Sequence, residues 1–260
     1  INDGMKFQIS TTAGGSTATY TEYGRFTNGG YFKAANNGGY NDSTGTYHEF
    51  SSTANALTVL MRANNSSFNQ AVLRQGCYRA ANSAYQFLAA DSGDGSTNPF
   101  NDTEFNLRGD GNGYCDGTWN GGGADYAEYF EWNDGNSDEE DRRGISVVLD
   151  GNKIRPAIEG EDPIGVISGN PSVVGDAAWN KWSGKYLRDD YGSYILDAGG
   201  YRQLNPAYDP DVEYVNRENR PEWDCVGLMG KLRIRKGQPT GSRWIKMRDV
   251  SATVEEWLVR

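Results

Sequence analysis

Two carboxylates, Asp125 and Glu128, stand three residues apart near the middle of the chain, directly after the glycine run 121–123. When two carboxyl groups lie close together their pKa values separate, so one stays ionised and activates water while the other donates a proton. Such a pair can hydrolyse an amide, and the glycines would let the adjoining peptide bond, Ala124–Asp125, bend back onto it. These residue types therefore favour cleavage of the chain by itself.

The same spacing also has a purely structural interpretation. Asp-x-x-Glu is the pattern of a helix N-terminus, in which Asp125 caps the first turn and Glu128 reaches back to the cap. Residues 126–132 would then form a short helix that packs its aromatic side chains. Both interpretations place the two carboxylates on one face of a helical turn, and the spacing alone leaves both open.

Other catalytic and metal-binding motifs are absent or incomplete. The only histidine, His48, lies in a strand-like run without a GxSxG motif, which argues against a Ser-His-Asp or Cys-His site. No GxxxxGK[ST] loop is present, and we expect no cofactor. The acidic run 134–141 departs from the EF-hand pattern, which favours a solvated loop. Cys77, Cys115 and Cys225 are too few and too far apart to predict a disulfide framework or a zinc site.

The composition indicates a β-rich protein with an acidic surface. The formal net charge is −10, which argues against nucleic acid and anionic membranes as partners. The 16 tyrosines and 7 tryptophans, in a chain that is polar overall, suit strands with many shallow aromatic contacts. No run of about 18 apolar residues is present, so we expect no membrane span. The chain begins at Ile1 without a signal peptide, and we expect a fragment or processed product.

Residues 1–123 carry 19 of the 34 glycines and a single proline, with short alternating runs between turn clusters. This pattern predicts half-buried strands at residues 6–9, 17–23, 47–50, 57–61 and 104–107. The alanine and leucine content of residues 71–90 would also tolerate a helix. Large aliphatic residues are few, so this half would gain most by packing against copies of itself, as in a trimeric β stalk. A single sandwich with many loops is the alternative.

Residues 124–260 contain longer apolar runs, which predict buried strands at 145–149 and 164–167 and a tight turn at 150–152. In the predicted strand 226–236, Leu232 and Ile234 face one way, and the three basic residues between and beside them face the other. A further pair of strands is predicted at residues 243–247 and 254–259, and a long surface loop at 197–223. The predicted fold class is mainly β, with a Gly-rich stalk or knob segment at 1–123 and a compact β-rich domain with short helices at 124–260.

Long, ordered motifs in the second half resemble a known family. Similarity to the peptidase G2 family runs through the segments GGGADYAEYFEW, EDRRGISVVLDGNKIRPA, DPIGVISGNPSVVGDAAWNKWSGKYLRDDYG, NRPEW and VGLMGKLRIRKG. That family is the C-terminal autoproteolytic, intramolecular chaperone domain of phage tail spikes, neck appendages and tail fibres. The resemblance covers nearly all of residues 124–260, and the preceding FNLRGDGNGYCDGTW resembles the fibre segment found before this domain.

The resemblance implies a chaperone that brings three fibre chains into register, after which each chain cuts itself in cis and the chaperone leaves. It places the cut at Ala124–Asp125, with Glu128 as the main catalytic carboxylate and Asp125 as its partner. Because Ala124 has no hydroxyl, carboxylate-activated water is favoured over a side-chain nucleophile. We also expect Arg142 or Arg143 to reach across a subunit contact as an electrostatic partner.

The partners implied by the resemblance are further copies of the chain in an intertwined homotrimer, other phage tail components and a host surface glycan. The implied location is the virion tail fibre or appendage, assembled in the cytoplasm of the host bacterium. The alternative function is a trimeric fibre tip that is not cleaved and binds a host glycan or receptor. Tryptophans suited to stacking on carbohydrate are Trp119, Trp179, Trp182 and Trp223, although core packing explains most of them equally well. A third option is a structural chaperone without protease activity.

Overall fold

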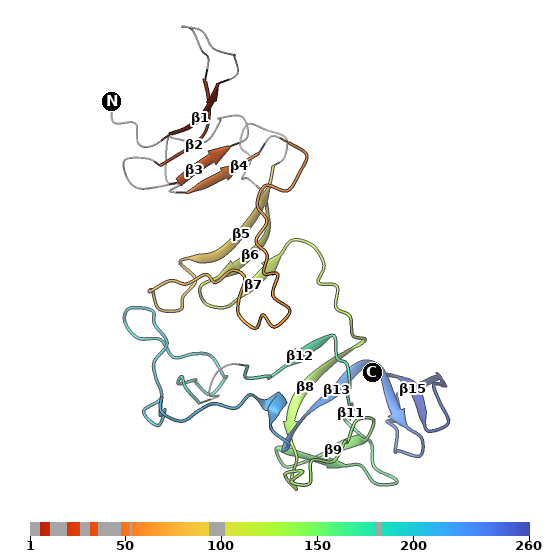
Figure 1. Ribbon diagram of the computed structural model, residues 1–260. Coiled ribbons are helices and arrows are strands. Elements are labelled where there is room, and N and C mark those ends of the chain that lie inside the picture. The colour runs from red at the N-terminus through yellow and green to blue at the C-terminus, as the bar shows by residue number, and fades with distance from the viewer. Residues whose placement is uncertain are drawn as a thin grey trace. The chain divides into compact units, whose positions relative to one another are not determined.

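The computed structural model describes residues 6–10, 20–26, 32–35, 48–52, 54–93, 102–179 and 184–260. The chain divides into two compact units, Ile1–Gly76 and Cys77–Arg260, and both are built from β-strands (Figure 1). The prediction of a mainly β fold is confirmed. The prediction of short helices is wrong, because the only helix in the described residues is a three-residue 3-10 helix, η1 (Arg217–Asn219). No helix in the described part of the chain is long and apolar enough to cross a membrane.

The first unit contains a four-stranded sheet in the order β1 (Lys6–Ser10), β2 (Tyr20–Phe26), β3 (Phe32–Ala35) and β4 (Glu49–Ser51). The first three strands are antiparallel, and β4 joins β3 in parallel. The strands predicted at 6–9 and 47–50 are confirmed where they are described. Of the strand predicted at 17–23, residues 20–23 fall in β2, and residues 17–19 lie outside the described residues.

A row of phenylalanines crosses this small sheet. The ring centroids of Phe26 and Phe32 are 5.3 Å apart, and Phe7 and Phe50 extend the row at 6.3 and 5.7 Å from their nearest members. Three of the four rings are nevertheless exposed in the single chain. The sheet therefore presents an aromatic face that the chain itself leaves largely uncovered.

Residues 54–76 contain neither helix nor strand. The strand predicted at 57–61 is therefore wrong: an alternating apolar pattern needs a neighbouring strand to satisfy its backbone, and none pairs with it among the described residues. The large apolar side chains of the segment are exposed, and they are Leu57, Val59, Leu60, Met61, Phe68, Val72 and Leu73. We call residues 57–73 the exposed apolar segment.

The second unit begins with a three-stranded antiparallel sheet of β5 (Gln86–Ser92), β6 (Asp102–Arg108) and β7 (Gly113–Cys115). The strand predicted at 104–107 lies within β6 and is confirmed. Residues 71–90, which were compatible with strand or helix, are irregular up to the start of β5 and contain no helix.

The larger sheet of the second unit has eight strands, and its long member is β13 (Trp223–Arg235). The path along the sheet is β10 (Lys153–Pro156), β9 (Ser146–Asp150), β11 (Gly165–Ile167), β13, β15 (Val254–Val259) and β14 (Ile245–Asp249). A branch is formed by β8 (Asp125–Glu131), which pairs antiparallel with β13 and parallel with β12 (Val173–Gly175). The strands predicted in this region from apolar runs are confirmed, as is the hairpin turn between β9 and β10.

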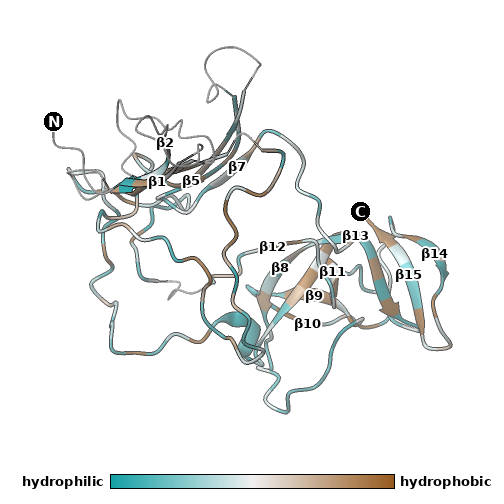
Figure 2. Ribbon diagram, turned by 45° about the horizontal axis from the view of Figure 1, so that its top comes forward, coloured by the Kyte–Doolittle hydropathy of each residue, from teal (hydrophilic) through white to brown (hydrophobic). Residues whose placement is uncertain are grey.

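Two clusters of buried side chains form the core of this sheet. One contains Trp132, Val147, Ile154, Ile167 and Val226, and the other contains Val166, Leu232, Ile234 and Val259. In Figure 2, brown hydrophobic stretches alternate with teal hydrophilic ones along these strands. The prediction for β13 is confirmed, because Leu232 and Ile234 are buried whereas Lys231, Arg233 and Arg235 are exposed. The sheet therefore provides a rigid frame for residues 124–131.

Candidate active site

Residues 125–131 form strand β8 and not the predicted helix. Two neighbouring strands hold them: β13 pairs with Asp125 through Glu131, and β12 pairs with Tyr126 through Glu128. Side chains alternate between the two faces of a strand, so residues three apart point to opposite faces. The expectation that Asp125 and Glu128 share one face is therefore wrong, and in one chain the two carboxylates diverge.

The peptide bond Ala124–Asp125 lies where the chain enters β8. Its carbonyl oxygen, that of Ala124, accepts a hydrogen bond of 3.2 Å from the backbone N–H of Lys231. The neighbouring Gly230 adopts φ +123°, and a Cβ there would come within 2.4 Å of the Ala124 oxygen. Only glycine accommodates both the backbone conformation and the close approach. The bulged part of β13 therefore places one N–H donor on the carbonyl of this peptide bond.

The Asp125 side chain is 6% exposed. Its Oδ1 accepts a hydrogen bond of 3.1 Å from the Ser168 hydroxyl, whereas its Oδ2 is buried and has no hydrogen-bond partner among the described residues. Burial raises the pKa of this carboxyl group, and the hydrogen bond from Ser168 offsets part of the rise. The carboxyl group beside the Ala124–Asp125 bond is therefore easier to protonate than an exposed aspartate.

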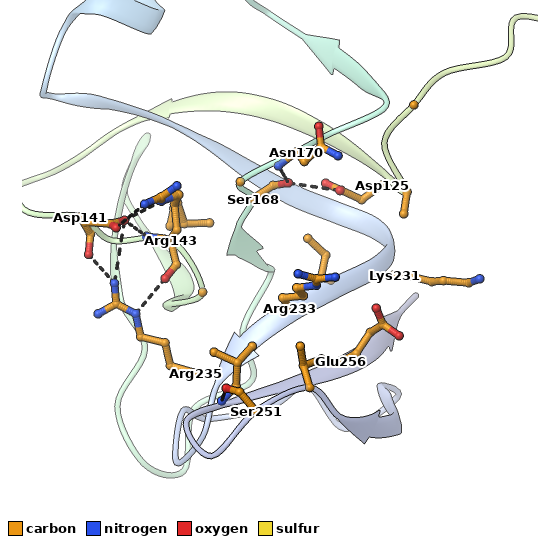
Figure 3. Close-up of a pocket in the computed structure, with 18 residues that line it drawn as sticks. Asp125, Asp141, Arg143, Ser168, Asn170, Lys231, Arg233, Arg235, Ser251 and Glu256 are labelled. Carbon is orange, nitrogen blue, oxygen red and sulfur yellow. Dashed lines mark hydrogen bonds and ion pairs between the residues drawn. The ribbon is translucent and has the colours of Figure 1, made fainter.

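A pocket of about 660 Å³ opens beside this bond. Its lining includes Ala124, Asp125, Arg143, Ser168, Lys231 and Arg233. Figure 3 shows the carboxyl group of Asp125 pointing toward Ser168, and the side chain of Lys231 extending away from it. Basic side chains, which also include Arg235, and the carboxyl groups of Asp125, Asp141 and Glu256 thus line a space large enough for water and for an incoming side chain.

Glu128 lies on the other face of β8 and is not part of this pocket. Its Oε1 accepts a hydrogen bond from the hydroxyl of Tyr126, which shares the face because it is two residues away. Gly175 of β12 packs against the pair, and a Cβ at that glycine would lie 2.8 Å from Glu128 Cγ and from the Tyr126 hydroxyl. The Glu128 side chain is thus held in place and remains partly exposed.

The two arginines proposed as electrostatic partners have different environments. Arg142 is 8% exposed and makes two hydrogen bonds to Asp134, at 2.9 and 2.8 Å. Its guanidinium group also lies 4.4 Å from the centre of the Trp132 ring. Arg142 is therefore fully engaged within its own chain.

Arg143 is 68% exposed and pairs with Asp141 at 2.6 Å. It lines the same pocket as Asp125. Of the two predicted partners, Arg143 is the one that the fold places beside the Ala124–Asp125 bond.

The remaining predicted residues lie elsewhere. His48 precedes β4 in the first unit, where its Nδ1 accepts a hydrogen bond from Phe32 N–H at 3.2 Å. The three cysteines are free. The described residues contain no group of three or more His, Cys, Asp or Glu side chains that could hold a metal ion. In the acidic run, Arg142 lowers the pKa of Asp134, and Arg143 lowers that of Asp141.

The tryptophans considered for carbohydrate binding also differ from one another. Trp119 and Trp179 are both 67% exposed. Trp223 is covered by Arg217, whose guanidinium carbon lies 3.9 Å from the ring centre. Trp182 lies outside the described residues.

Sequence reasoning missed Ser168 and the backbone of Lys231. Ser168 follows the last residue of β11 and is 43 positions from the carboxyl group that it contacts. Its only local signal is a polar Ser-Gly-Asn turn directly after a buried apolar run, a place where functional side chains are often found. Contacts to Lys231 involve the backbone, which leaves no trace in residue type.

Comparison with known proteins relates this chain to one family and to proteins of Bacillus phages. The family model Peptidase_G2, described as the IMC autoproteolytic cleavage domain, matches residues 80–257. The pre-neck appendage protein of Bacillus phage B103 is 42% identical over 127 residues, which make up 45% of this chain and 14% of that protein. The putative phage-related protein YobO of Bacillus subtilis strain 168 is 34% identical over 136 residues, or 48% of this chain and 16% of that protein. The chain therefore spans only a small part of the curated relatives that it matches.

A similar solved structure is the crystal structure of the pre-mature bacteriophage phi29 gene product 12. It superposes with a TM-score of 0.54 at 27% sequence identity, and the match covers 61% of this chain and 24% of that chain. The similarity in sequence and the similarity in fold thus point to the same group of proteins.

Proposed function

Because this chain belongs to the Peptidase_G2 family of IMC (intramolecular chaperone) autoproteolytic cleavage domains, we propose that it cuts its own backbone between Ala124 and Asp125. The observation that carries this proposal is the buried Asp125 carboxyl group, which has an unpartnered oxygen beside that bond. Burial raises the pKa of this carboxyl group, which favours the protonated form that can donate to a leaving amine.

The proposed step is hydrolysis by an activated water molecule. The water oxygen bonds to the Ala124 carbonyl carbon, and one water proton passes to the Glu128 carboxylate. The bond from that carbon to the Asp125 nitrogen then breaks as the nitrogen takes the proton of the Asp125 carboxyl group. The Lys231 N–H stabilises the negative charge that develops on the Ala124 oxygen. The products are a carboxyl terminus at Ala124 and an amino terminus at Asp125.

The Glu128 that acts on a given bond comes from a second copy of the chain in this proposal. Within one chain Glu128 faces away from Asp125, and its Cα lies about 10 Å along the strand, beyond the reach of a glutamate side chain. A carboxylate from a neighbour would enter the pocket beside the bond, where Arg143, Lys231 and Arg233 are available as cations, although Asp141 and Glu256 line the same pocket. Such a site is complete only after assembly, so it would prevent early cleavage.

We propose a homotrimer as the assembled state. The exposed apolar segment, 57–73, and the phenylalanine row of the first sheet support association, since large apolar side chains exposed together mark interaction surfaces. Three copies would bury these side chains against one another around a common axis. The expected mass by light scattering is three times 28.6 kDa before cleavage.

The proposed biological setting is a phage neck appendage or tail fibre. The relatives from Bacillus phages B103 and phi29 are named pre-neck appendage proteins, and the virion appendage is accordingly the proposed location, with assembly in the host bacterium. In this proposal residues 1–123 are the fibre segment and residues 124–260 the self-cleaving chaperone domain. Early folding of the larger sheet would raise the effective concentration of the three fibre segments, and the cut would make assembly irreversible.

Denaturing mass spectrometry tests the cleavage. Freshly expressed wild type should give two fragments that meet at Ala124 and Asp125, whereas Glu128→Gln and Asp125→Asn should each remain intact. Loss of a catalytic acid or base typically slows such a step about 10²- to 10⁴-fold. Intact wild type in the assembled state, or a cut Glu128→Gln variant, would contradict the proposed mechanism.

A mixing experiment tests where the catalytic Glu128 comes from. Chains with Glu128→Gln keep their own Asp125, so co-expression with Asp125→Asn chains should restore cleavage of the Glu128→Gln chain alone. The matched control replaces the Asp125→Asn partner by the double variant Asp125→Asn/Glu128→Gln, which lacks Glu128 and therefore should not restore cleavage. No cleavage in either mixture would assign Glu128 to its own chain.

A second candidate function is a fibre surface that binds host glycan without cleavage. The exposure of Trp119 and Trp179 favours it, because flat exposed tryptophans stack well on sugar rings. Uncut wild type, together with glycan binding that both Trp119→Ala and Trp179→Ala weaken, would favour this function.

A further inference from the structure

We propose that the loop 168–172 is a substrate-binding wall that selects glycine at positions 121 and 123, but not at position 122, in the segment before the cut. This inference rests on the proposed cleavage at Ala124–Asp125 and specifies the kind of chain that the site accepts. The accepted segment has no side chain two and four residues before the cut.

Gly123 lies against the backbone of the loop. A Cβ at this position would come within 2.4 Å of the Pro171 carbonyl carbon and the Ser172 nitrogen, and within 2.5 Å of the Asn170 oxygen. All three of these atoms belong to the backbone, which cannot turn aside as a flexible side chain can. Any side chain at position 123 would therefore push the segment away from the loop.

Gly121 makes a similar approach to a more adaptable neighbour. A Cβ there would lie 2.1 Å from the Ser172 hydroxyl oxygen, 3.2 Å from the Ser172 carbonyl oxygen and 3.3 Å from its Cβ. The hydroxyl group can rotate, so a side chain at position 121 is opposed less strongly than one at position 123.

Gly122 is the internal control that the chain itself supplies. A Cβ at this position would meet no atom within 4 Å. None of the three glycines adopts the left-handed backbone conformation that other residues avoid. Space, and not backbone dihedral angle, therefore distinguishes positions 121 and 123 from position 122.

The same loop holds the chain on the other side of the cut. The Ser172 N–H donates to the Asp125 carbonyl oxygen at 2.8 Å, and the Ser168 hydroxyl donates to the Asp125 carboxyl group. Within the loop, the Asn170 N–H donates to the Ser168 hydroxyl oxygen at 3.3 Å. One short loop thus fixes both the glycines before the bond and the acid after it, so displacement of the glycines would move the Ala124 carbonyl out of its reacting position.

The test compares Gly121→Ala, Gly122→Ala and Gly123→Ala in the full chain, with the cut fraction followed over time by denaturing mass spectrometry. We expect wild-type rates for Gly122→Ala and a rate slower on the order of a hundredfold for Gly123→Ala. Gly121→Ala should be slower by a smaller factor, and Ser172→Gly in the same chain should restore its rate, because it removes the hydroxyl group that the new Cβ meets. Tryptophan fluorescence during thermal unfolding checks that each variant is folded.

Several outcomes would overturn this inference. A Gly122→Ala variant as slow as Gly123→Ala would show that the glycines provide general flexibility. Wild-type cleavage in all three variants would remove the wall while leaving the proposed cleavage intact, and an uncut wild type would overturn both. If Gly123→Ala does not fold, the test is the comparison of Gly121→Ala with the double variant Gly121→Ala/Ser172→Gly. A cleavage rate that Ser172→Gly does not restore would count against the proposal.

Discussion

Large apolar side chains are exposed along residues 57–73, whereas the sheet of residues 125–259 buries a core of them. Leu57 and Leu60 are 80% and 65% exposed, whereas Ile234 and Trp132 are fully buried. The sheet can fold with the core that one chain supplies, whereas the large side chains of the exposed apolar segment remain largely accessible to solvent. This difference supports the proposal that the second region folds first and that association stabilises the first.

The largest effect expected within this comparison is at the centre of the sheet. Ile234→Ala should lower the free energy of unfolding by about 2 to 5 kcal/mol, because it leaves a cavity beside Leu232 and Val259. Leu60→Ala should change it by less than about 0.5 kcal/mol in the dissociated chain. Urea unfolding followed by far-UV circular dichroism measures both, because all seven tryptophans lie after residue 118 and their fluorescence would not report on the unit that contains Leu60.

Equal losses in the free energy of unfolding for Ile234→Ala and Leu60→Ala in the dissociated chain would contradict the contrast between the two regions. The same measurement on the assembled protein tests whether the exposed apolar segment lies at an interface. If it does, Leu60→Ala should destabilise the assembly.

Neighbouring arginines offer a smaller contrast within the sheet region. Arg142→Ala should cost about 2 kcal/mol, since it removes the cation above Trp132 and both hydrogen bonds to Asp134. Arg143→Ala removes an exposed pair with Asp141 and should leave stability unchanged within experimental error. Arg143→Ala should instead slow cleavage, and a normal cleavage rate would remove Arg143 from the proposed site.

The smallest effect concerns the pH dependence of stability at Asp125. Burial raises the pKa of this carboxyl group in the folded state, so its contribution to stability is complete below the unfolded pKa, near 3.9, and is lost as the pH rises through the folded pKa. Asp125→Asn removes this loss. Relative to the parent chain, the variant should therefore become more stable as the pH rises from 3 to 7.

Both chains in that measurement should carry Glu128→Gln, so that neither is cut during denaturation. A stability difference that stays constant with pH would contradict the raised pKa. Ser168→Ala provides a matched test of direction, because loss of the hydrogen bond that opposes the rise should extend the pH dependence to higher pH.

Local pattern was sufficient for most strands of the sheet around the site, although not for β8 itself. Short apolar runs identified β9 and β11, alternation of apolar and basic residues identified β13, and Asp-Gly-Asn identified the turn after β9. These features are encoded in neighbouring residues, since strand periodicity and turn chemistry depend on the next few positions. The residue types also predict that Asp125, Glu128 and the glycines before them are a place for chemistry.

Only the tertiary structure decided how those residues are arranged. The Asp-x-x-Glu pattern favours a helix cap when considered alone, but pairing with β12 and β13 makes residues 125–131 a strand and sends the two carboxylates to opposite faces. The hydrogen bond from Ser168, the N–H of Lys231 and the close approach of Gly123 to Pro171 join segments that are distant in sequence. Such contacts depend on strand order and register, and a local pattern carries no information about either.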